Sequence, residues 1–355
     1  MMKAFAVTSP DGPELSEIEI AEPELSGREV LVDVTHAGVC HTDLHLRSGG
    51  YDLGSAGFLS LLDRGVQYPL IMGHEIAGTV RAVGDEVTDL QVGQQVVVYP
   101  WLGCGECATC LTGNENQCPV KNRGLGVALH GGYADAVWVP DAKYCVSLDG
   151  IDPEWGATLA CSGVTAYSAA RKVSNIPADH PILVIGAGGV GLTAIATLHA
   201  LGHENIVVVD RHDGTFQYAK ELGATKTAVI GDETNGSDIG EIVGEKPAAI
   251  IDFVNSTQTS KLAFDSIRRA GTIVQVGLFG GELRVPTALT VIQQVSIIGS
   301  YVGGLNDLRA VVDLAKEGKL PRSPIATAEL SLDSLNGVLT AMEDGRSRGR
   351  TVLVR

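Results

Sequence analysis

Short apolar runs alternate with helical stretches between residue 181 and about residue 299. The apolar runs span Ile182–Ile185, Ile206–Val209, Ala248–Ile251 and Thr272–Val276, and the helical stretches between them include Phe216–Leu222 and Ser260–Ile267. Strands that alternate with helices in this way are typical of βαβ units and a parallel sheet. We therefore predict a doubly wound α/β domain in this part of the chain.

The pattern before and after this region is different. The first 150 residues contain short β-branched runs bounded by glycine and polar residues, such as Val30–Val34 and Gln95–Tyr99, and are predicted to be β-rich. In the tail, Asp307–Lys316 and Leu332–Glu343 are predicted helices, and Thr351–Val354 is a predicted closing strand.

One apolar segment is long enough to raise the question of a membrane span. Residues Ile182 to Leu201 lack Asp, Glu, Lys and Arg, over roughly the 20 residues that cross a bilayer. Glycines cluster inside the segment, at the point where a strand would turn into a helix. The turn is the favoured interpretation, and no membrane partner is expected.

Composition and charge narrow the function classes. The 355 residues exceed the length of one typical domain, and a hydrophobic share of 45% is enough to form substantial cores. The formal net charge of −16 argues against nucleic acid or an anionic membrane as a partner, because both attract basic surfaces.

The chain contains 7 cysteines, and its start, Met1-Met2-Lys3-Ala4, leads into strand-like residues without an apolar signal region. A disulfide framework is therefore not expected, and metal binding or catalysis is the better use for these thiols. Thiols committed to metal imply a reducing compartment, so we expect a cytoplasmic protein.

A glycine-rich loop follows the strand Ile182–Ile185 and opens a helix that runs through Leu198. Its glycines and valine match the pattern G-x-G-x-x-G: Gly186, Gly188, Gly189, Val190 and Gly191. Asp210 ends the next strand about 20 residues on, which completes the context of a Rossmann dinucleotide site. The helix N-terminus would face a pyrophosphate, and Asp210 would bind the ribose hydroxyls and repel a 2′-phosphate. NAD is therefore favoured over NADP, although Arg211 could partly accommodate that phosphate.

Four further cysteines lie close together, at Cys104, Cys107, Cys110 and Cys118, in the spacing C-x2-C-x2-C-x7-C. Four thiolates can complete a tetrahedral zinc shell with no open position, which would make the site structural. An iron–sulfur cluster also takes four cysteines. Zinc is favoured because this is a lone ligand cluster in a surface-like lobe beside a nucleotide domain.

The remaining motifs are Cys40-His41-Thr42-Asp43-Leu44-His45, Gly73-His74-Glu75 and Leu159-Ala160-Cys161-Ser162-Gly163. Together with the four-cysteine lobe and the Rossmann half, they resemble the zinc-dependent medium-chain alcohol dehydrogenases over nearly the whole chain. The resemblance implies a β-rich GroES-like catalytic domain with the zinc lobe at residues 1–162, an NAD-binding Rossmann domain at 163–299, and a return to the catalytic domain at 300–355.

The same resemblance implies the roles of individual residues. Cys40, His74 and Cys161 would hold a catalytic zinc with one open position, Glu75 would sit behind the metal, and Asp43 would orient His74. Thr42 and His45 would carry the released proton to solvent. His41 and Arg350 would contact the pyrophosphate, and Thr165, Val276, Gly277 and Leu278 would orient the nicotinamide. This gives two zinc ions per chain and leaves Cys145 without a role.

One stretch and one tryptophan bear on the substrate. The stretch Tyr51–Leu62 is longer than in most relatives and could line the substrate pocket through Phe58, Leu59 and Leu62, or serve as a surface lid or subunit contact. Trp101 is another candidate for the pocket wall. These residues suggest a hydrophobic secondary, cyclic or aryl alcohol and its carbonyl product.

Three further interpretations complete the picture. The family resemblance implies a homotetramer or homodimer, and the β-branched segment Val291–Tyr301 could pair with its symmetry mate. A polyol or sugar-alcohol dehydrogenase is an alternative enzyme. A zinc-stabilised NAD-binding sensor without catalysis is a second alternative, against which the complete set of zinc ligands and relay residues argues.

Overall fold

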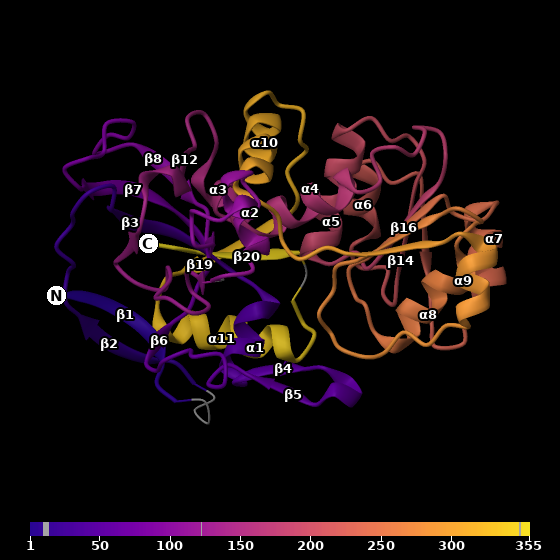
Figure 1. The fold of residues 1–355 in the computed structure, drawn as a ribbon, viewed down its shortest axis with the longest axis horizontal. Coiled ribbons are helices and arrows are strands. Elements are labelled where there is room, and N and C mark those ends of the chain that lie inside the picture. Colours follow the sequence, from indigo (N-terminus) through magenta and orange to yellow (C-terminus); the bar gives the residue numbers. More distant parts are fainter. Residues whose placement is uncertain (10–13, 122, 348) are drawn as a thin grey trace.

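The computed structural model describes residues 1–9, 14–121, 123–347 and 349–355. Two sheets lie side by side, and both chain ends belong to the lobe that contains the N-terminal strands (Figure 1). The fold is α/β with a parallel sheet, as the hydrophobic pattern predicts.

The parallel sheet has the strand order β15-β14-β13-β16-β17-β18, and every pairing in it is parallel. Its strands are β13 (Ile182–Ile185), β14 (Ile206–Asp210), β15 (Lys226–Val229), β16 (Ala249–Asp252), β17 (Thr272–Gln275) and β18 (Ser296–Gly299). Its helices are α5 (Gly189–Ala200), α6 (Phe216–Glu221), α7 (Gly236–Val243), α8 (Thr257–Ser266) and α9 (Thr287–Gln293). The predicted strands are confirmed to within one residue at each end.

The central strand β13 shows why its sequence is a continuous apolar run. Ile182 and Val184 pack into one hydrophobic cluster, whereas Leu183 and Ile185 pack into another. Alternate side chains therefore point to opposite faces of the sheet, and helices cover both faces.

The second sheet has the order β12-β8-β7-β3-β20-β19, with β11 also paired to β3. Its strands are β3 (Val30–Val39), β7 (Glu75–Val83), β8 (Gln95–Val98), β11 (Ala136–Val139), β12 (Cys145–Ser147), β19 (Ile325–Glu329) and β20 (Arg350–Val354). β20 runs antiparallel to β3, with Thr351 opposite Val39. The tail of the chain thus completes the sheet that the first 150 residues begin, while the domain limits at 162 and 299 remain predictions.

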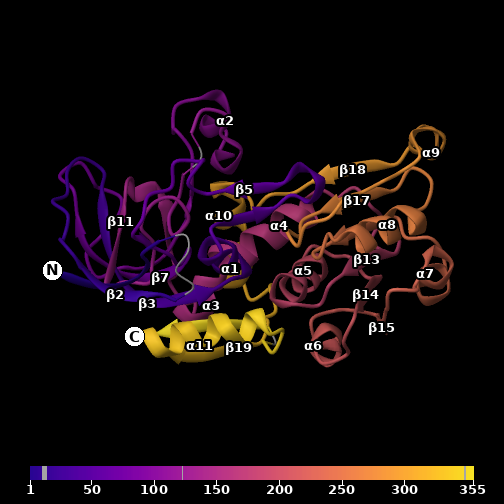
Figure 2. The same cartoon turned by 90° about the horizontal axis from the view of Figure 1, so that it is seen from below.

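Smaller elements surround this sheet. They are β1 (Met2–Val7), β2 (Ser16–Ile20), β4 (Gly50–Asp52), η1 (Gly54–Ala56), β5 (Phe58–Ser60), β6 (Leu70–Ile71), β9 (Trp101–Leu102), η2 (Glu115–Gln117), β10 (Arg123–Gly124) and η3 (Ala142–Tyr144). The remaining helices are α1 (His41–Arg47), α2 (Ala108–Leu111), α3 (Pro153–Thr158), η4 (Leu159–Gly163), α4 (Val164–Arg171), α10 (Leu305–Lys316) and α11 (Leu332–Glu343). α2 projects from the body of the molecule (Figure 2).

The segment Val291–Tyr301 corrects one expectation. Val291 and Ile292 lie in α9 and not in a strand, and only residues 296–299 of the segment form β18. Gln294 adopts a left-handed conformation that ends the helix. β18 does form one edge of the parallel sheet.

The long apolar segment at Ile182–Leu201 divides into β13, the glycine loop and α5, as the glycines suggest. Within the described part of the chain, every helix is too short or too polar to cross a membrane.

Candidate active site

Three separate elements bring one metal-ligating cluster together. Cys40 immediately precedes α1, His74 immediately precedes β7, and Cys161 lies in the π-helical turn η4 between α3 and α4. The ligating atoms of Cys40, His74, Glu75 and Cys161 all lie within 4.8 Å of one another, and all four residues are buried. A π-helical turn is frequently found at functional sites, and here it carries Cys161 to within 3.9 Å of Cys40, sulfur to sulfur.

These residues fit a zinc ion. A tetrahedral ion with Zn–S bonds of about 2.3 Å separates two ligand sulfurs by about 3.8 Å, close to the observed 3.9 Å. His74 Nε2 is buried and makes no hydrogen bond within the described part of the chain. A buried imidazole nitrogen without a partner is costly unless it binds something. Glu75 instead contacts Arg350, whose guanidinium donates to the Glu75 carboxylate.

The charges of the cluster favour cation binding. The contact with Cys161, opposed by burial and aided by His74, lowers the pKa of the Cys40 thiol well below its usual range. The same contact and burial raise the pKa of the Cys161 thiol. Burial lowers the pKa of His74, but Asp43 and Cys40 outweigh it and raise that pKa overall. A bound cation would replace the protons that the cluster otherwise shares.

Asp43 lies beside His74, the residue that it is predicted to orient. Its Oδ1 is 3.6 Å from His74 Nδ1, and its Oδ2 accepts a hydrogen bond from the Cys40 amide at 2.9 Å. The same Oδ2 accepts a hydrogen bond from the Tyr133 hydroxyl at 2.8 Å. One carboxylate therefore contacts two of the cluster residues.

Tyr133 was not identified from the sequence. Its side chain is fully buried and packs against Gly73, where a Cβ would lie 2.6 Å from the ring. Gly73 also has a positive φ of 87°. The glycine before His74 is the one sequence signal for this close approach, and nothing in it names the partner.

The predicted proton relay lies at the cleft beside the cluster. Thr42 and His45 are three residues apart in α1 and so share one helix face. Both line the same cleft as Cys40 and Cys161. The His45 ring lies 4.7 Å from the Tyr51 ring, and burial lowers the pKa of His45. His41 also lines the cleft, where its ring lies 5.5 Å from the Phe279 ring.

The glycine-rich loop opens onto the same cleft. Gly186, Gly188, Gly189, Val190 and Gly191 all line it, as do Asp210 and Arg211. A Cβ at Gly191 would lie 1.9 Å from the Gly186 carbonyl oxygen, so glycine is required there. Asp210 accepts a hydrogen bond from the Ala187 amide at 2.6 Å, which fixes the carboxylate beside the loop. Arg211 contacts Asp232 and Gln258, so its charge is already partly neutralised.

The other predicted cofactor residues are brought to this cleft as well. Thr165, Val276, Gly277, Leu278 and Arg350 line it. Arg350 is 5% exposed, and its guanidinium contacts Glu75 of the metal cluster. The Arg350 guanidinium that contacts Glu75 is also the group that is predicted to contact the pyrophosphate.

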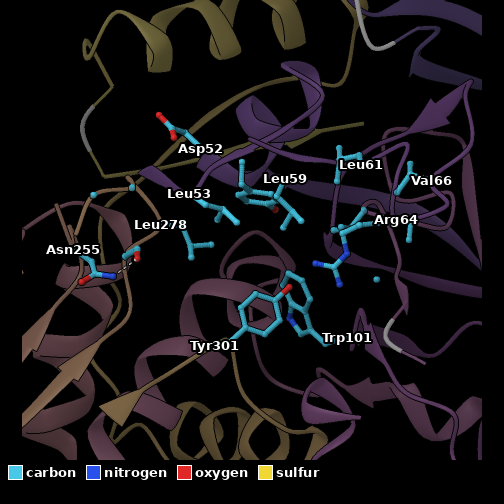
Figure 3. Close-up of a pocket in the computed structure, with 17 residues that line it drawn as sticks. Asp52, Leu53, Leu59, Leu61, Arg64, Val66, Trp101, Asn255, Leu278 and Tyr301 are labelled. Atoms are coloured by element: carbon cyan, nitrogen blue, oxygen red, sulfur yellow. Dashed lines mark hydrogen bonds between the residues drawn. The ribbon is translucent and has the colours of Figure 1, made fainter. Parts of the chain in front are cut away.

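Figure 3 shows a cavity of about 590 Å³ with Trp101 and Tyr301 in its wall. The cavity adjoins the cleft and shares Tyr51, Trp101 and Tyr301 with it. Trp101 lines it as predicted, and so does Leu59. The expectation for Phe58 and Leu62 is wrong, because they are 59% and 51% exposed and lie outside the lining. Successive residues of β5 point to opposite sides, so Leu59 and Phe58 cannot both face the cavity. The apolar lining comes instead from Tyr51, Leu53, Leu61 and Val66.

The four-cysteine lobe forms a second cluster. Its sulfurs lie 3.5 Å apart for Cys107–Cys110 and 3.8 Å apart for Cys104–Cys110 and Cys107–Cys118. These separations match the edges of a tetrahedral zinc–sulfur site. Backbone amides of Cys104 and Cys107 donate to cluster sulfurs, which stabilises thiolates.

A buried carboxylate supports this lobe. Glu115 accepts hydrogen bonds from the Gly103 amide at 3.1 Å and from the Tyr144 hydroxyl, and pairs with Lys143 at 2.9 Å. All seven cysteines are free thiols, including Cys145, which lies in β12 outside both clusters.

Comparisons with known proteins agree with this geometry. The family described as alcohol dehydrogenase GroES-like domain matches residues 26–150, and the family described as zinc-binding dehydrogenase matches residues 189–317. The chain is 36% identical over 342 residues to an NAD-dependent alcohol dehydrogenase of Sulfurisphaera tokodaii, covering 96% of each protein.

Solved structures show the same fold. The alcohol dehydrogenase from the archaeon Aeropyrum pernix superposes with a TM-score of 0.88 at 29% identity, covering 99% of this chain and 100% of that one. An acetophenone reductase from Geotrichum candidum, solved in complex with NAD, superposes with a TM-score of 0.84 at 26% identity, covering 100% of this chain and 97% of that one.

Proposed function

The chain belongs to the zinc-dependent medium-chain alcohol dehydrogenase family, and we propose that it transfers hydride reversibly between an alcohol and NAD. The observation that carries the proposal is the cluster of Cys40, His74 and Cys161 at a cleft that Cys40, Cys161 and the glycine-rich loop line. A metal cluster and a dinucleotide loop in one cleft are what this reaction needs. A binding protein without catalysis would need neither an unpartnered His74 Nε2 nor the neighbouring Thr42 and His45.

The two cofactors have separate tasks. When bound, zinc supplies a Lewis acid that lowers the pKa of the substrate hydroxyl, and NAD supplies the hydride acceptor. Cys40, His74 and Cys161 would hold the catalytic zinc, and Cys104, Cys107, Cys110 and Cys118 would hold a structural zinc.

The chain's own residues orient the cofactor and remove the proton. The amides at the start of α5, together with His41 and Arg350, would bind the pyrophosphate of the cofactor. Asp210 binds the ribose hydroxyls, and Thr165 and the backbone of 276–278 orient the nicotinamide. Thr42 and His45 would carry the hydroxyl proton to solvent, and burial lowers the pKa of His45, which keeps its imidazole neutral and able to accept a proton at neutral pH.

The substrate we propose is a hydrophobic secondary, cyclic or aryl alcohol. Trp101, Tyr51, Tyr301 and Leu59 give the adjoining cavity an apolar and aromatic wall. The structural neighbour named acetophenone reductase acts, by its name, on an aryl ketone, which favours the aryl member of this group.

The proposal is tested by following NADH formation with primary, secondary, cyclic, aryl and polyol alcohols, together with metal analysis. Cys161→Ser should abolish turnover and lower the zinc content from two ions to one per chain, while NAD binding and the zinc of the lobe are retained. Cys145→Ser is the matched control, because Cys145 lies outside both clusters, and it should keep activity and both zinc ions. A fully active Cys161→Ser variant would refute the ligand assignment.

We also propose that the protein is a homotetramer or homodimer. The edge strand β18 and the exposed apolar residues Val291 and Ile292 of the adjacent α9 support an interface there. The commitment of six thiols to metal favours a reducing, cytoplasmic location.

A further inference from the structure

Arg64 introduces a positive charge into a cavity whose wall combines aliphatic and aromatic side chains with the polar Asp52 and Asn255. Among the described residues that line the cavity, it carries the one cationic side chain. It is exposed, and its guanidinium contacts no carboxylate within the described part of the chain. By contrast, Arg47, Arg322 and Arg350 each contact a carboxylate.

The backbone holds Arg64 in place at the cavity mouth. The Arg64 amide donates to the Leu61 carbonyl at 3.1 Å, and the Leu61 amide donates to the Gly49 carbonyl at 3.0 Å. Leu61 is buried and anchors this turn between β5 and β6. The guanidinium extends from the turn toward Trp101 and Tyr301 (Figure 3).

Two aromatic rings separate Arg64 from the metal cluster. The Trp101 ring centroid lies 5.3 Å from that of His74 on one side and 5.9 Å from that of Tyr301 on the other. Burial, aided by Cys161 and opposed by Arg64, raises the pKa of Tyr301 to about 12. Trp101 and Tyr301 line both this cavity and the cleft that Cys40 and Cys161 line, so the two aromatic side chains lie between Arg64's cavity and the cluster's cleft.

We propose that Arg64 determines substrate specificity by binding a carboxylate at the far end of the alcohol, so that the preferred substrate is a hydroxy acid with an apolar body. This inference rests on the proposed dehydrogenase function. The hydroxyl would lie at the Cys40–His74–Cys161 cluster, the hydrocarbon against Trp101 and Tyr301, and the carboxylate on the guanidinium fork.

Charge considerations favour a carboxylate in particular. The chain has a net charge of −16, which repels anions unless a local cation compensates. One guanidinium matches one carboxylate in charge and geometry, whereas a phosphate dianion would stay only half compensated. The acidic residue of the lining, Asp52, accepts a hydrogen bond from the Gly54 amide and lies at the opposite end of the cavity from Arg64 (Figure 3).

The reaction leaves the carboxylate unchanged. The carbon that bears the hydroxyl gives a hydride to NAD, the hydroxyl gives a proton to solvent, and a carbonyl group forms at that carbon. The product is the corresponding oxo acid.

The test compares matched alcohols with and without the anion. We would measure kcat/KM for ω-hydroxy carboxylates of increasing chain length and for the n-alcohols of the same length, and for para-(hydroxymethyl)benzoate and para-methylbenzyl alcohol. In the wild type, kcat/KM should be higher for the hydroxy acid than for the matched neutral alcohol, either at one chain length of the ω-hydroxy series or in the aryl pair. Arg64→Met, which keeps an apolar stem, should lower the ratio of acid to neutral alcohol by about tenfold.

Controls separate this role from general damage. Arg64→Lys keeps the charge but loses the fork, so its ratio should lie between those of the wild type and Arg64→Met. Arg269→Met removes an exposed arginine beyond α8 and should leave the ratio unchanged. Because Arg64 is exposed, the preference should also weaken as salt increases.

The outcomes are distinguishable. If the wild type oxidises neutral alcohols but shows no preference for any acid, or if Arg64→Met keeps the preference, the role of Arg64 is refuted and the dehydrogenase function stands. If neither class is oxidised, the proposed function itself fails.

Discussion

Replacing Tyr133 with phenylalanine tests how much the residues around the Cys40–His74–Cys161 cluster contribute to its affinity for zinc. Tyr133 is fully buried, and its hydroxyl donates to Asp43 Oδ2 at 2.8 Å. Phenylalanine keeps the ring and its packing against Gly73, so the change removes the hydrogen bond to the buried carboxylate and a longer one to the Gly38 carbonyl at 3.3 Å. Asp43 Oδ2 would then accept a hydrogen bond from the Cys40 amide alone among the partners described for that atom.

The expected magnitude follows from these contacts. A hydrogen bond to a charged group contributes about 1.5–3 kcal/mol, and a loss of about 2 kcal/mol corresponds to roughly 30-fold in an equilibrium constant. Because Asp43 lies 3.6 Å from His74 Nδ1, the loosened carboxylate should orient His74 less well. Loss of such a supporting contact typically lowers metal affinity by about 10–100-fold.

The assay is zinc release to a competing chelator, followed by metal analysis and by residual activity, with the midpoint of urea unfolding measured in parallel. Tyr133→Phe should lose the catalytic zinc first and keep the zinc of the four-cysteine lobe. Tyr144→Phe is the matched control, since Tyr144 donates to the buried Glu115 beside the lobe. It should loosen the lobe zinc and spare the catalytic one. Equal release of both ions from the two variants would refute the reasoning.

Three further predictions concern the cofactor, the relay and the assembly. Asp210→Gly should shift the ratio of kcat/KM for NAD over NADP toward NADP by at least tenfold, because the carboxylate that repels a 2′-phosphate is gone; an unchanged ratio would contradict its role. Burial lowers the pKa of His45, so wild-type kcat for alcohol oxidation should fall as pH drops through that lowered pKa and the imidazole becomes protonated. His45→Gln should lower kcat at neutral pH by about 100-fold and remove this acid limb from the pH profile, whereas a retained limb would assign it to another group. Ser296 of β18 and Ser300, which follows β18, donate their amides to the Gly271 and Gln275 carbonyls on the β17 side, so the Ile297 amide faces the free edge. Ile297→Pro should therefore lower the oligomeric mass in light scattering while the fold persists, and an unchanged mass would place the interface elsewhere.

Much of the fold could be predicted because its signals are local. The run Ile182–Ile185 is a strand buried on both faces, and the helix Leu332–Glu343 has the predicted bounds. The segment Val291–Tyr301 was predicted poorly because β-branched residues are common in strands, yet Val291 and Ile292 lie in a helix that ends at the left-handed Gln294. Strand propensity is a weak guide where tertiary contacts determine the secondary structure.

The lining of the substrate cavity could also be predicted only in part from residue types. Trp101 and Leu59 line it as expected, whereas Phe58 and Leu62 do not. β4 and β5 form an antiparallel hairpin. The side of this hairpin that faces the cavity depends on its register and packing, which the residue types do not reveal. Arg64 was missed for the same reason, because an arginine in a polar turn is usually a solvated surface residue.

The sequence by itself determined the chemistry that the chain could support. The glycine loop with Asp210 and the four closely spaced cysteines are complete within short stretches, so their spacing is enough to predict a dinucleotide site and a metal site. The tertiary structure alone brought Cys40 and Cys161 together across 121 positions of sequence, placed Tyr133 on Asp43, and turned Arg64 into the cavity. These contacts depend on how two sheets pack around one cleft, and that packing arises from burial of many side chains over both domains.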